Sequence, residues 1–275
     1  MTDQLQSFDP FAKELAYVRV NERLIDRTLR RLKGCQQVAM LDVAAGTGLM
    51  TGLAHERARQ LGIQLQSTLI DLDGPALQIA RQEVGETGAH YVIADAAHLP
   101  FVHQFDVAVF ANSLHLLDDD AKRAALQGVH QVLRPGAVLA VNTTFYDGAY
   151  PEESKPFYSR WIRRAVAEMN RRVPNRSKGE RAQAMESLPA EGYRQLVECA
   201  GFEIAEMRER RVLLSQSAVR AICGYKNFAM GALHATDEDA EQASQALQVT
   251  VRQTFRDLKM HYLPRNWLEI IAVRA

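Results

Sequence analysis

The feature that most constrains this chain is a glycine-rich turn between a strand-like and a helix-like segment. Residues 38–43 form a short apolar run typical of a strand, and residues 49–61 are typical of a helix. Ala44-Ala45-Gly46-Thr47-Gly48 joins them. Glycine permits positive φ and close approach of the backbone to a ligand, and the start of a helix presents N–H donors with partial positive charge. The turn therefore predicts a site for a nucleotide-like ligand that carries an anionic group.

The same order of strand and helix repeats along the chain. Such alternation predicts parallel strands joined by right-handed crossovers. We therefore expect an α/β fold, a Rossmann-like, doubly wound and mostly parallel seven-stranded sheet, with the site at the carboxyl ends of the strands. Strands are expected at residues 38–43, 65–70, 91–94, 105–110, 137–143, 202–214 and 267–273, and helices at 49–61, 76–84, 118–132, 190–200 and 237–259.

Three segments interrupt this alternation and are expected to be helical. We expect them to form a helical cap over the active site, while the rest of the chain forms the core. The cap segments are residues 1–34, with a helix over 8–33, residues 147–190, with a helix over 154–172, and residues 215–235; the core is residues 35–146 and 191–275, with a turn at Leu133-Arg134-Pro135-Gly136.

Two acidic residues accompany the glycine-rich turn. Asp71 follows the next strand, where a carboxylate can bind both hydroxyls of a ribose. Asp42 lies at the end of the first strand, where its carboxylate could accept a hydrogen bond from an ammonium group. The segment from Gly46 to Thr51 lacks the third glycine of the G-x-G-x-x-G turn, which argues against a dinucleotide as the ligand.

Taken in order, these motifs resemble those of the small-molecule class I methyltransferases that use S-adenosylmethionine (SAM). Asp42, Gly46 and Gly48 match the D/E-x-G-x-G-x-G pattern of that family, and Ala44 replaces its first glycine. The resemblance covers residues 36–145 and the tail from 191, and it implies SAM as the cofactor. The cofactor-binding residues it implies are Asp42, Ala44, Gly46, Thr47 and Gly48 in the turn, Asp71 for the ribose with Leu72 beside it, Asp95 and Ala96 for the adenine, and Asn112 after a later strand.

The residues that would act on the methyl acceptor have weaker signals. His115 is the candidate general base, although the resemblance implies that this position often only lines the site. Tyr17 and Tyr146 are the other catalytic candidates, and packing in a helix is an equal reading for Tyr17. The substrate-binding candidates are Asn21, Phe157, Trp161 and Arg164. The alternative for Phe157 and Trp161 is packing in the core. The alternative for the basic stretch over residues 160–181 is a solvated face.

Composition limits the partners. Lys+Arg and Asp+Glu both number 33, so the formal net charge of zero argues against a dedicated nucleic-acid binder. Cys35, Cys199 and Cys223 are too far apart for a zinc motif and are expected to be small buried residues. We read Asp118-Asp119-Asp120 as a helix cap, so no metal is expected.

No leader or membrane span is expected either. The first residues lack a basic region followed by an apolar one, and no apolar run reaches the ~18 residues of a membrane helix. We expect a cytoplasmic monomer or homodimer that acts on a small molecule, without nucleic acid or membrane as a partner.

The expected function is methylation of an oxygen or carbon atom on a small, partly apolar metabolite, such as a carboxylic acid or a natural-product intermediate. Three alternatives stay open: an enzyme of this fold that alkylates within SAM and releases methylthioadenosine, an RNA methyltransferase, and a non-catalytic SAM-binding module. Neutral charge and the lack of an RNA-binding appendage argue against the second.

Overall fold

The computed structural model describes residues 8–177, 179 and 187–275. They divide into two compact units. We call one the sheet unit, which comprises residues 19–147, 188–210 and 267–275. The other, the helical unit, comprises the described residues of 1–18, 148–187 and 211–266.

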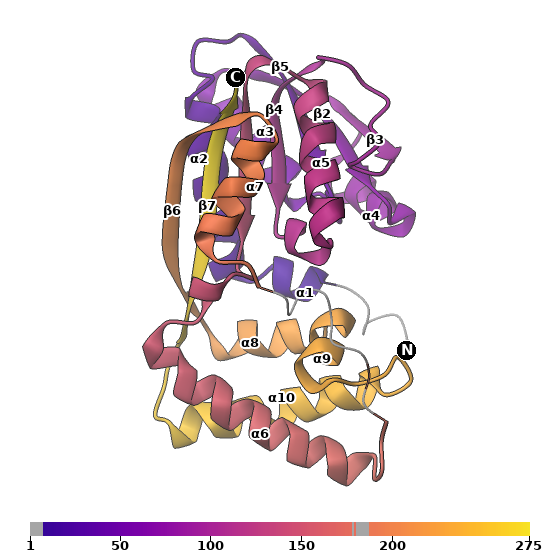
Figure 1. The fold of residues 1–275 in the computed structure, drawn as a ribbon, viewed down its shortest axis with the longest axis vertical. Coiled ribbons are helices and arrows are strands. Elements are labelled where there is room, and N and C mark those ends of the chain that lie inside the picture. Colours follow the sequence, from indigo (N-terminus) through magenta and orange to yellow (C-terminus); the bar gives the residue numbers. More distant parts are fainter. Residues whose placement is uncertain (1–7, 178, 180–186) are drawn as a thin grey trace. The chain divides into compact units, whose positions relative to one another are not determined.

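The sheet has seven strands in the order β3-β2-β1-β4-β5-β7-β6 (Figure 1). Pairing is parallel between β1 and β2, β2 and β3, β1 and β4, and β4 and β5, whereas β7 runs antiparallel to β5. The expected Rossmann-like, mostly parallel sheet is therefore confirmed. The strands are β1 (Gln37–Val43), β2 (Gln64–Asp71), β3 (Ala89–Ile93), β4 (Phe105–Ala111), β5 (Leu133–Thr143), β6 (Phe202–Leu214) and β7 (Leu263–Arg274).

Helices with one apolar face cover this sheet. In α2, Leu24, Ile25 and Leu29 recur at helical spacing and are buried against β1 and the next helix, α3. Asp73 and Asp118 cap the following two helices by accepting backbone N–H bonds from Ala76 and Ala121. The helices are α2 (Leu15–Arg30), α3 (Leu49–Leu61), α4 (Gly74–Val84), α5 (Asp119–Val132) and α7 (Ala190–Cys199).

The helical unit has an aromatic core. The ring of Phe157 on α6 packs 4.7 Å from that of Phe255 on α10, and the indole N–H of Trp161 donates to the carbonyl of Leu247 at 3.0 Å. Arg164 forms an ion pair with Asp257 across the same pair of helices. The helices are α1 (Asp9–Ala12), α6 (Lys155–Arg172), α8 (Gln216–Cys223), α9 (Lys226–Leu233) and α10 (Ala240–Asp257).

The unit boundaries differ from the expected ones in two places. Most of α2 belongs to the sheet unit, because its apolar face is buried there, although residues 1–34 are expected in the cap. Conversely, α10 is expected in the core but packs on α6, α8 and α9 in the helical unit.

Several local expectations were wrong. The helix expected over 8–33 is interrupted between α1 and α2. The turn expected at Leu133–Gly136 is the start of β5, whose register with β4 shifts between Phe105 and Val107. Cys35 and Cys199 are exposed, and only Cys223 is buried.

Part of the basic stretch, Lys178 and Arg181, lies outside the described residues. Among the helices that the structure describes, none combines the length and apolar character that crossing a membrane requires.

Candidate functional site

The order of the strands reverses at β1, which has β2 on one side and β4 on the other. In sheets of this type, ligands bind beyond the carboxyl ends of the strands at that switch point. Directly after β1 and β4 come Ala44, with φ of 52°, and Asn112, with φ of 51°. Left-handed backbone is uncommon outside glycine, persists only where the surroundings fix it, and clusters at functional sites. These two left-handed residues coincide with the switch point, which makes the edge between β1 and β4 the candidate site.

The glycine-rich turn is held in place by short backbone contacts. Gly46 donates its N–H to Oδ2 of Asp71 at 2.7 Å, and Ala45 donates to the carbonyl of Ile70 at 3.0 Å. Gly48, with φ of 84°, begins α3, and a Cβ there would lie 2.9 Å from Cγ2 of Val84 on α4. A Cβ at Gly46 would meet nothing within 4 Å. Gly48 is therefore needed for packing, whereas the space beside Gly46 is open to a ligand.

Asp71 keeps acceptor capacity for a ligand. Its Oδ2 accepts from Gly46 and its Oδ1 accepts from the backbone N–H of Asp73 at 2.9 Å. A carboxylate has about four lone-pair sites, so each oxygen can take one further donor. The next residue, Leu72, is 70% exposed. A charged acceptor beside an exposed apolar side chain suits the ribose and base of an adenosine.

Asp42 is enclosed by the protein. It is 1% exposed, and its Oδ2 accepts from the backbone N–H of Thr51 at 3.1 Å and from the Thr51 hydroxyl at 2.7 Å. Burial raises the pKa of Asp42 to about 7, against the opposing effect of the two Thr51 bonds and with a small addition from the charge of Asp71. The contacts give Asp42 a role in fastening the first turn of α3 to β1.

The segment after β3 is positioned by α5. Oδ1 of Asp95 accepts from the backbone N–H of Ala97 at 2.9 Å. A Cβ on Gly128 of α5 would lie 2.2 Å from the carbonyl oxygen of Ala96. This glycine therefore lets the Asp95–Ala96 segment rest directly on the helix. Its signal in the sequence is an isolated glycine inside an otherwise amphipathic helix.

Asn112 is fixed on two sides. Its backbone N–H donates to the carbonyl of Asn142 on β5 at 2.9 Å, and its Oδ1 accepts from the indole N–H of Trp267 on β7 at 3.1 Å. Trp267 was not predicted to be a site residue, because an aromatic residue in an apolar strand is typical of a core.

Of the acceptor-binding candidates, three lie in the sheet unit. His115, 5% exposed, stacks on Phe145 with ring centroids 4.1 Å apart, and its Nδ1 lies 3.3 Å from the Thr143 hydroxyl. Asn21 is fully buried and accepts from Nδ2 of Asn142 at 2.8 Å, and Tyr146 is buried after β5. These are ordered side chains near the ends of β4 and β5.

The other four candidates lie in the helical unit. The ring of Tyr17 packs 5.4 Å from Phe8 and 5.0 Å from Phe11. Phe157, Trp161 and Arg164 make the contacts between α6 and α10 described above. All four therefore take part in the packing of that unit.

Comparison with known proteins identifies the family. A mixed seven-stranded sheet with a glycine-rich turn at its switch point defines a Rossmann-like α/β protein, and a family model described as a methyltransferase domain matches residues 40–136. An O-methyltransferase of Penicillium expansum is 36% identical over 151 residues, 52% of this chain and 51% of that protein. The malonyl-[acyl-carrier protein] O-methyltransferase of Salmonella typhimurium is 31% identical over 137 residues, 50% of each chain.

Among solved structures, the fold is similar to that of 1,6-didemethyltoxoflavin-N1-methyltransferase from Burkholderia thailandensis. That structure contains S-adenosylhomocysteine (SAH). The two structures align with a TM-score of 0.53 and 15% sequence identity, and the alignment covers 97% of this chain and 81% of that one. The chain belongs to the class I SAM-dependent methyltransferases. The matched region spans about half the length of the two curated relatives named above.

Proposed function

We propose that the protein transfers a methyl group from SAM to an oxygen or carbon atom of a small molecule. The observation that supports this most directly is the hydrogen bond between Gly46 and Asp71, which builds one binding edge from the ends of β1 and β2. We also propose which residues bind the cofactor.

The residues at this edge fit SAM. The start of α3, with Gly46, Thr47 and Gly48 leading into it, would receive the carboxylate of the methionine part. Asp71 would bind the ribose hydroxyls, and Leu72 would lie against the adenine. The proposed site also includes Asp95, Ala96, Asn112, Ala44 and Asp42. Asp42 contributes by its two hydrogen bonds to Thr51, which position α3.

When bound, SAM supplies a methyl group attached to a positively charged sulfur. In one step, a nucleophile can bond to the methyl carbon while the bond from this carbon to the sulfur breaks. The protein has to orient the acceptor and exclude water. Where the acceptor must lose a proton, His115 is the proposed base, because Phe145 and Thr143 hold its ring in one orientation. On the basis of the sequence alone, we propose that six further side chains contact the acceptor. They are Tyr146 and Asn21 in the sheet unit, and Tyr17, Phe157, Trp161 and Arg164 in the helical unit.

The names of the two relatives reported above favour an oxygen atom as the acceptor. Both curated relatives named above are O-methyltransferases, and one of them acts on a malonyl group. A carboxylic acid or a hydroxylated metabolite is therefore the proposed substrate class. The formal net charge of zero supports a small molecule over a nucleic acid.

The product of turnover tests the proposal. The purified protein is incubated with SAM and a small-metabolite extract, and the nucleoside products are separated by mass. Formation of SAH together with a metabolite heavier by one methylene is expected. Methylthioadenosine as the product would instead indicate alkylation within SAM, and no turnover despite SAM binding would indicate a binding module. An Asp71→Ala variant serves as the control for contaminating enzymes.

A further inference from the structure

We propose that Trp267 is a positioning residue for cofactor binding, acting through Asn112. The indole N–H donates to Oδ1 of Asn112 at 3.1 Å, although the two residues lie on β7 and after β4, with β5 between these strands. This inference rests on the proposed function, which places the cofactor at the end of β4.

Asn112 needs external support to keep its backbone conformation. Its φ of 51° lies in the left-handed region, which asparagine tolerates better than most residues but still at a cost in energy. The carbonyl of Asn142 holds its backbone N–H at 2.9 Å, and Trp267 holds its side chain. Together these contacts orient the residue before any ligand arrives, which is the condition for a preorganised binding group.

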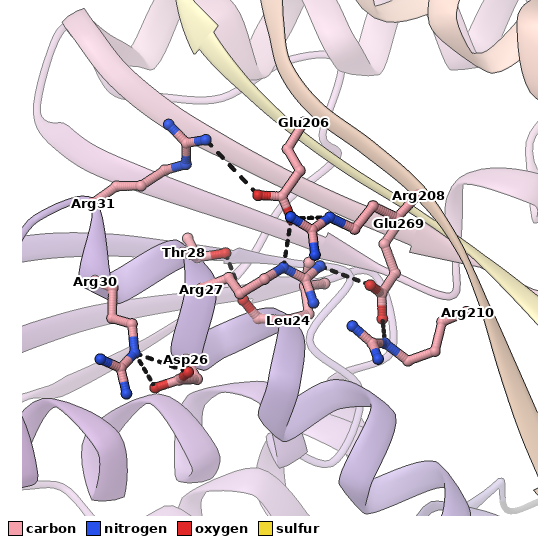
Figure 2. Close-up of polar contacts among 10 residues, drawn as sticks. All are labelled: Leu24, Asp26, Arg27, Thr28, Arg30, Arg31, Glu206, Arg208, Arg210 and Glu269. Atoms are coloured by element: carbon pink, nitrogen blue, oxygen red, sulfur yellow. Dashed lines mark hydrogen bonds and ion pairs between the residues drawn. The ribbon is translucent and has the colours of Figure 1, made fainter.

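The strand that carries Trp267 is itself anchored by buried charges. Glu269 lies two residues further along β7, on the same face of the strand, and its side chain is fully buried. It forms ion pairs with Arg27 of α2 at 2.6 Å and with Arg210 of β6 at 2.9 Å (Figure 2). Arg27 also contacts Glu206 of β6 at 2.7 Å.

Buried ion pairs of this kind can fix the register of packed elements. Here they tie β7 to both α2 and β6, and none of these ion pairs involves Asn112 or another residue proposed to bind the cofactor. The position of Trp267 is thus set independently of the proposed ligand. Its indole N–H is a fixed donor, and Asn112 is the residue that it orients.

The two tryptophans of the chain provide a matched comparison. Both are buried, and each donates its indole N–H to an oxygen, Trp267 to Asn112 and Trp161 to the carbonyl of Leu247. Trp267→Phe and Trp161→Phe therefore remove equivalent bonds, one at the proposed site and one in the core of the helical unit. Binding of SAH by calorimetry is the readout.

We expect Trp267→Phe to weaken SAH binding by about three- to tenfold, the value of one neutral hydrogen bond. Trp161 is a candidate contact of the acceptor and not of the cofactor, so Trp161→Phe should leave SAH binding, measured without an acceptor, within about twofold of wild type. Because Trp267 acts through Asn112, the double variant Trp267→Phe/Asn112→Ala should bind SAH no more weakly than Asn112→Ala alone. A merely structural role for Trp267 would not produce this non-additivity.

The inference is overturned if Trp267→Phe binds SAH as wild type does, or if its effect adds fully to that of Asn112→Ala. Loss of SAH binding in Asp71→Ala, combined with no effect of Trp267→Phe, would reject this inference and leave the proposed function standing. Absence of SAH binding by the wild type would reject both. Should Trp267→Phe fail to fold, benzothienylalanine can replace Trp267 in a Trp161→Phe background. This residue keeps the ring volume of tryptophan but lacks its N–H. The same change in SAH affinity is expected, and the same results would overturn the inference.

Discussion

Gly46 donates its backbone N–H to the carboxylate of Asp71 at 2.7 Å, which joins the turn after β1 to the end of β2. The two residues are 25 positions apart in the chain and meet because parallel neighbouring strands end at the same edge. Hydrogen bonds to a charged acceptor are stronger than neutral ones. The turn and its acidic partner are therefore one preformed unit.

Gly48→Ala should destabilise the protein. The residue has φ of 84°, and its new Cβ would lie 2.9 Å from Cγ2 of Val84 and 3.1 Å from Cβ of Ala80. Left-handed alanine costs about 1 to 2 kcal/mol and the overpacking a similar amount, so the free energy of unfolding in urea should fall by about 2 to 4 kcal/mol. Gly52→Ala is the control in the same helix, where a Cβ meets nothing within 4 Å; it should be neutral or stabilise by up to about 1 kcal/mol. Equal stability of the two variants would contradict the packing described.

Ala44→Gly should make the protein slightly more stable. Alanine at φ of 52° costs about 1 kcal/mol that glycine avoids, and the larger freedom of glycine in the unfolded chain offsets roughly half of it. We expect a gain of about 0.5 kcal/mol in urea denaturation and SAH affinity within about twofold of wild type. Ala45→Gly is the control, since Ala45 has no positive φ and packs on the cluster around Leu69; it should lose stability. If Ala44→Gly lost as much stability as Ala45→Gly, this would argue against backbone strain at Ala44.

Most of the fold followed from local patterns. The alternation of apolar strands with helices predicted the sheet and placed Asp71 beside the turn, because both signals lie within a few residues of a strand end. The start of β5 was missed, since Pro135 and Gly136 are typical of a turn and only pairing with β4 extends the strand through them. The membership of α10 was missed for a similar reason: an amphipathic pattern shows that a face is buried, not which neighbour buries it.

The site was predicted less completely. The pairing of Asp42 with Thr51 and of Asn112 with Trp267 depends on the fold, the latter across 155 residues of sequence. No periodicity encodes which buried donor reaches which acceptor. Gly128 illustrates the same point, because its need for a bare backbone comes from the carbonyl of Ala96 on another element.

Asp42→Asn should change how stability depends on pH. The pKa of Asp42 is about 7 in the folded protein, against an ordinary 3.8. The folded state thus binds this proton more tightly, so that the free energy of unfolding of the wild type falls as pH rises from about 4 to about 7 and then stays level. Asp42→Asn has no such proton. Its free energy of unfolding should exceed that of the wild type by roughly 2 to 4 kcal/mol at pH 8 and should show no excess at pH 4.

Thr51→Val provides the matched test of that pH effect. The Thr51 hydroxyl donates to the charged form of Asp42 at 2.7 Å, so its removal should cost more stability at pH 8 than at pH 4. Urea denaturation at pH 4, 6 and 8 measures both variants. Parallel pH profiles for wild type and Asp42→Asn would show that Asp42 does not titrate in this range.

Glu269→Gln should be strongly destabilising. Its carboxylate is fully buried between Arg27 and Arg210, and removal of its charge takes away the ion pair of Arg210 and one of the two ion pairs of Arg27 (Figure 2). Breaking a buried pair in this way costs about 3 to 5 kcal/mol. Glu203→Gln on β6 is the control, because this residue is exposed, and its stability should equal that of the wild type. An unchanged unfolding midpoint for Glu269→Gln would show that the cluster does not anchor β7.

The most direct test of the account is the binding of SAH to wild type, Asp71→Ala and Asp73→Asn by calorimetry. The wild type should bind one SAH per chain. Asp71→Ala should bind at least roughly thirtyfold more weakly, since hydrogen bonds to a charged group contribute about 1.5 to 3 kcal/mol each. Asp73→Asn, two residues away, keeps the helix cap that accepts from Ala76 and should bind as the wild type does. Equal affinity of Asp71→Ala and wild type, or no binding by the wild type, would contradict the assignment of this edge as the SAM site.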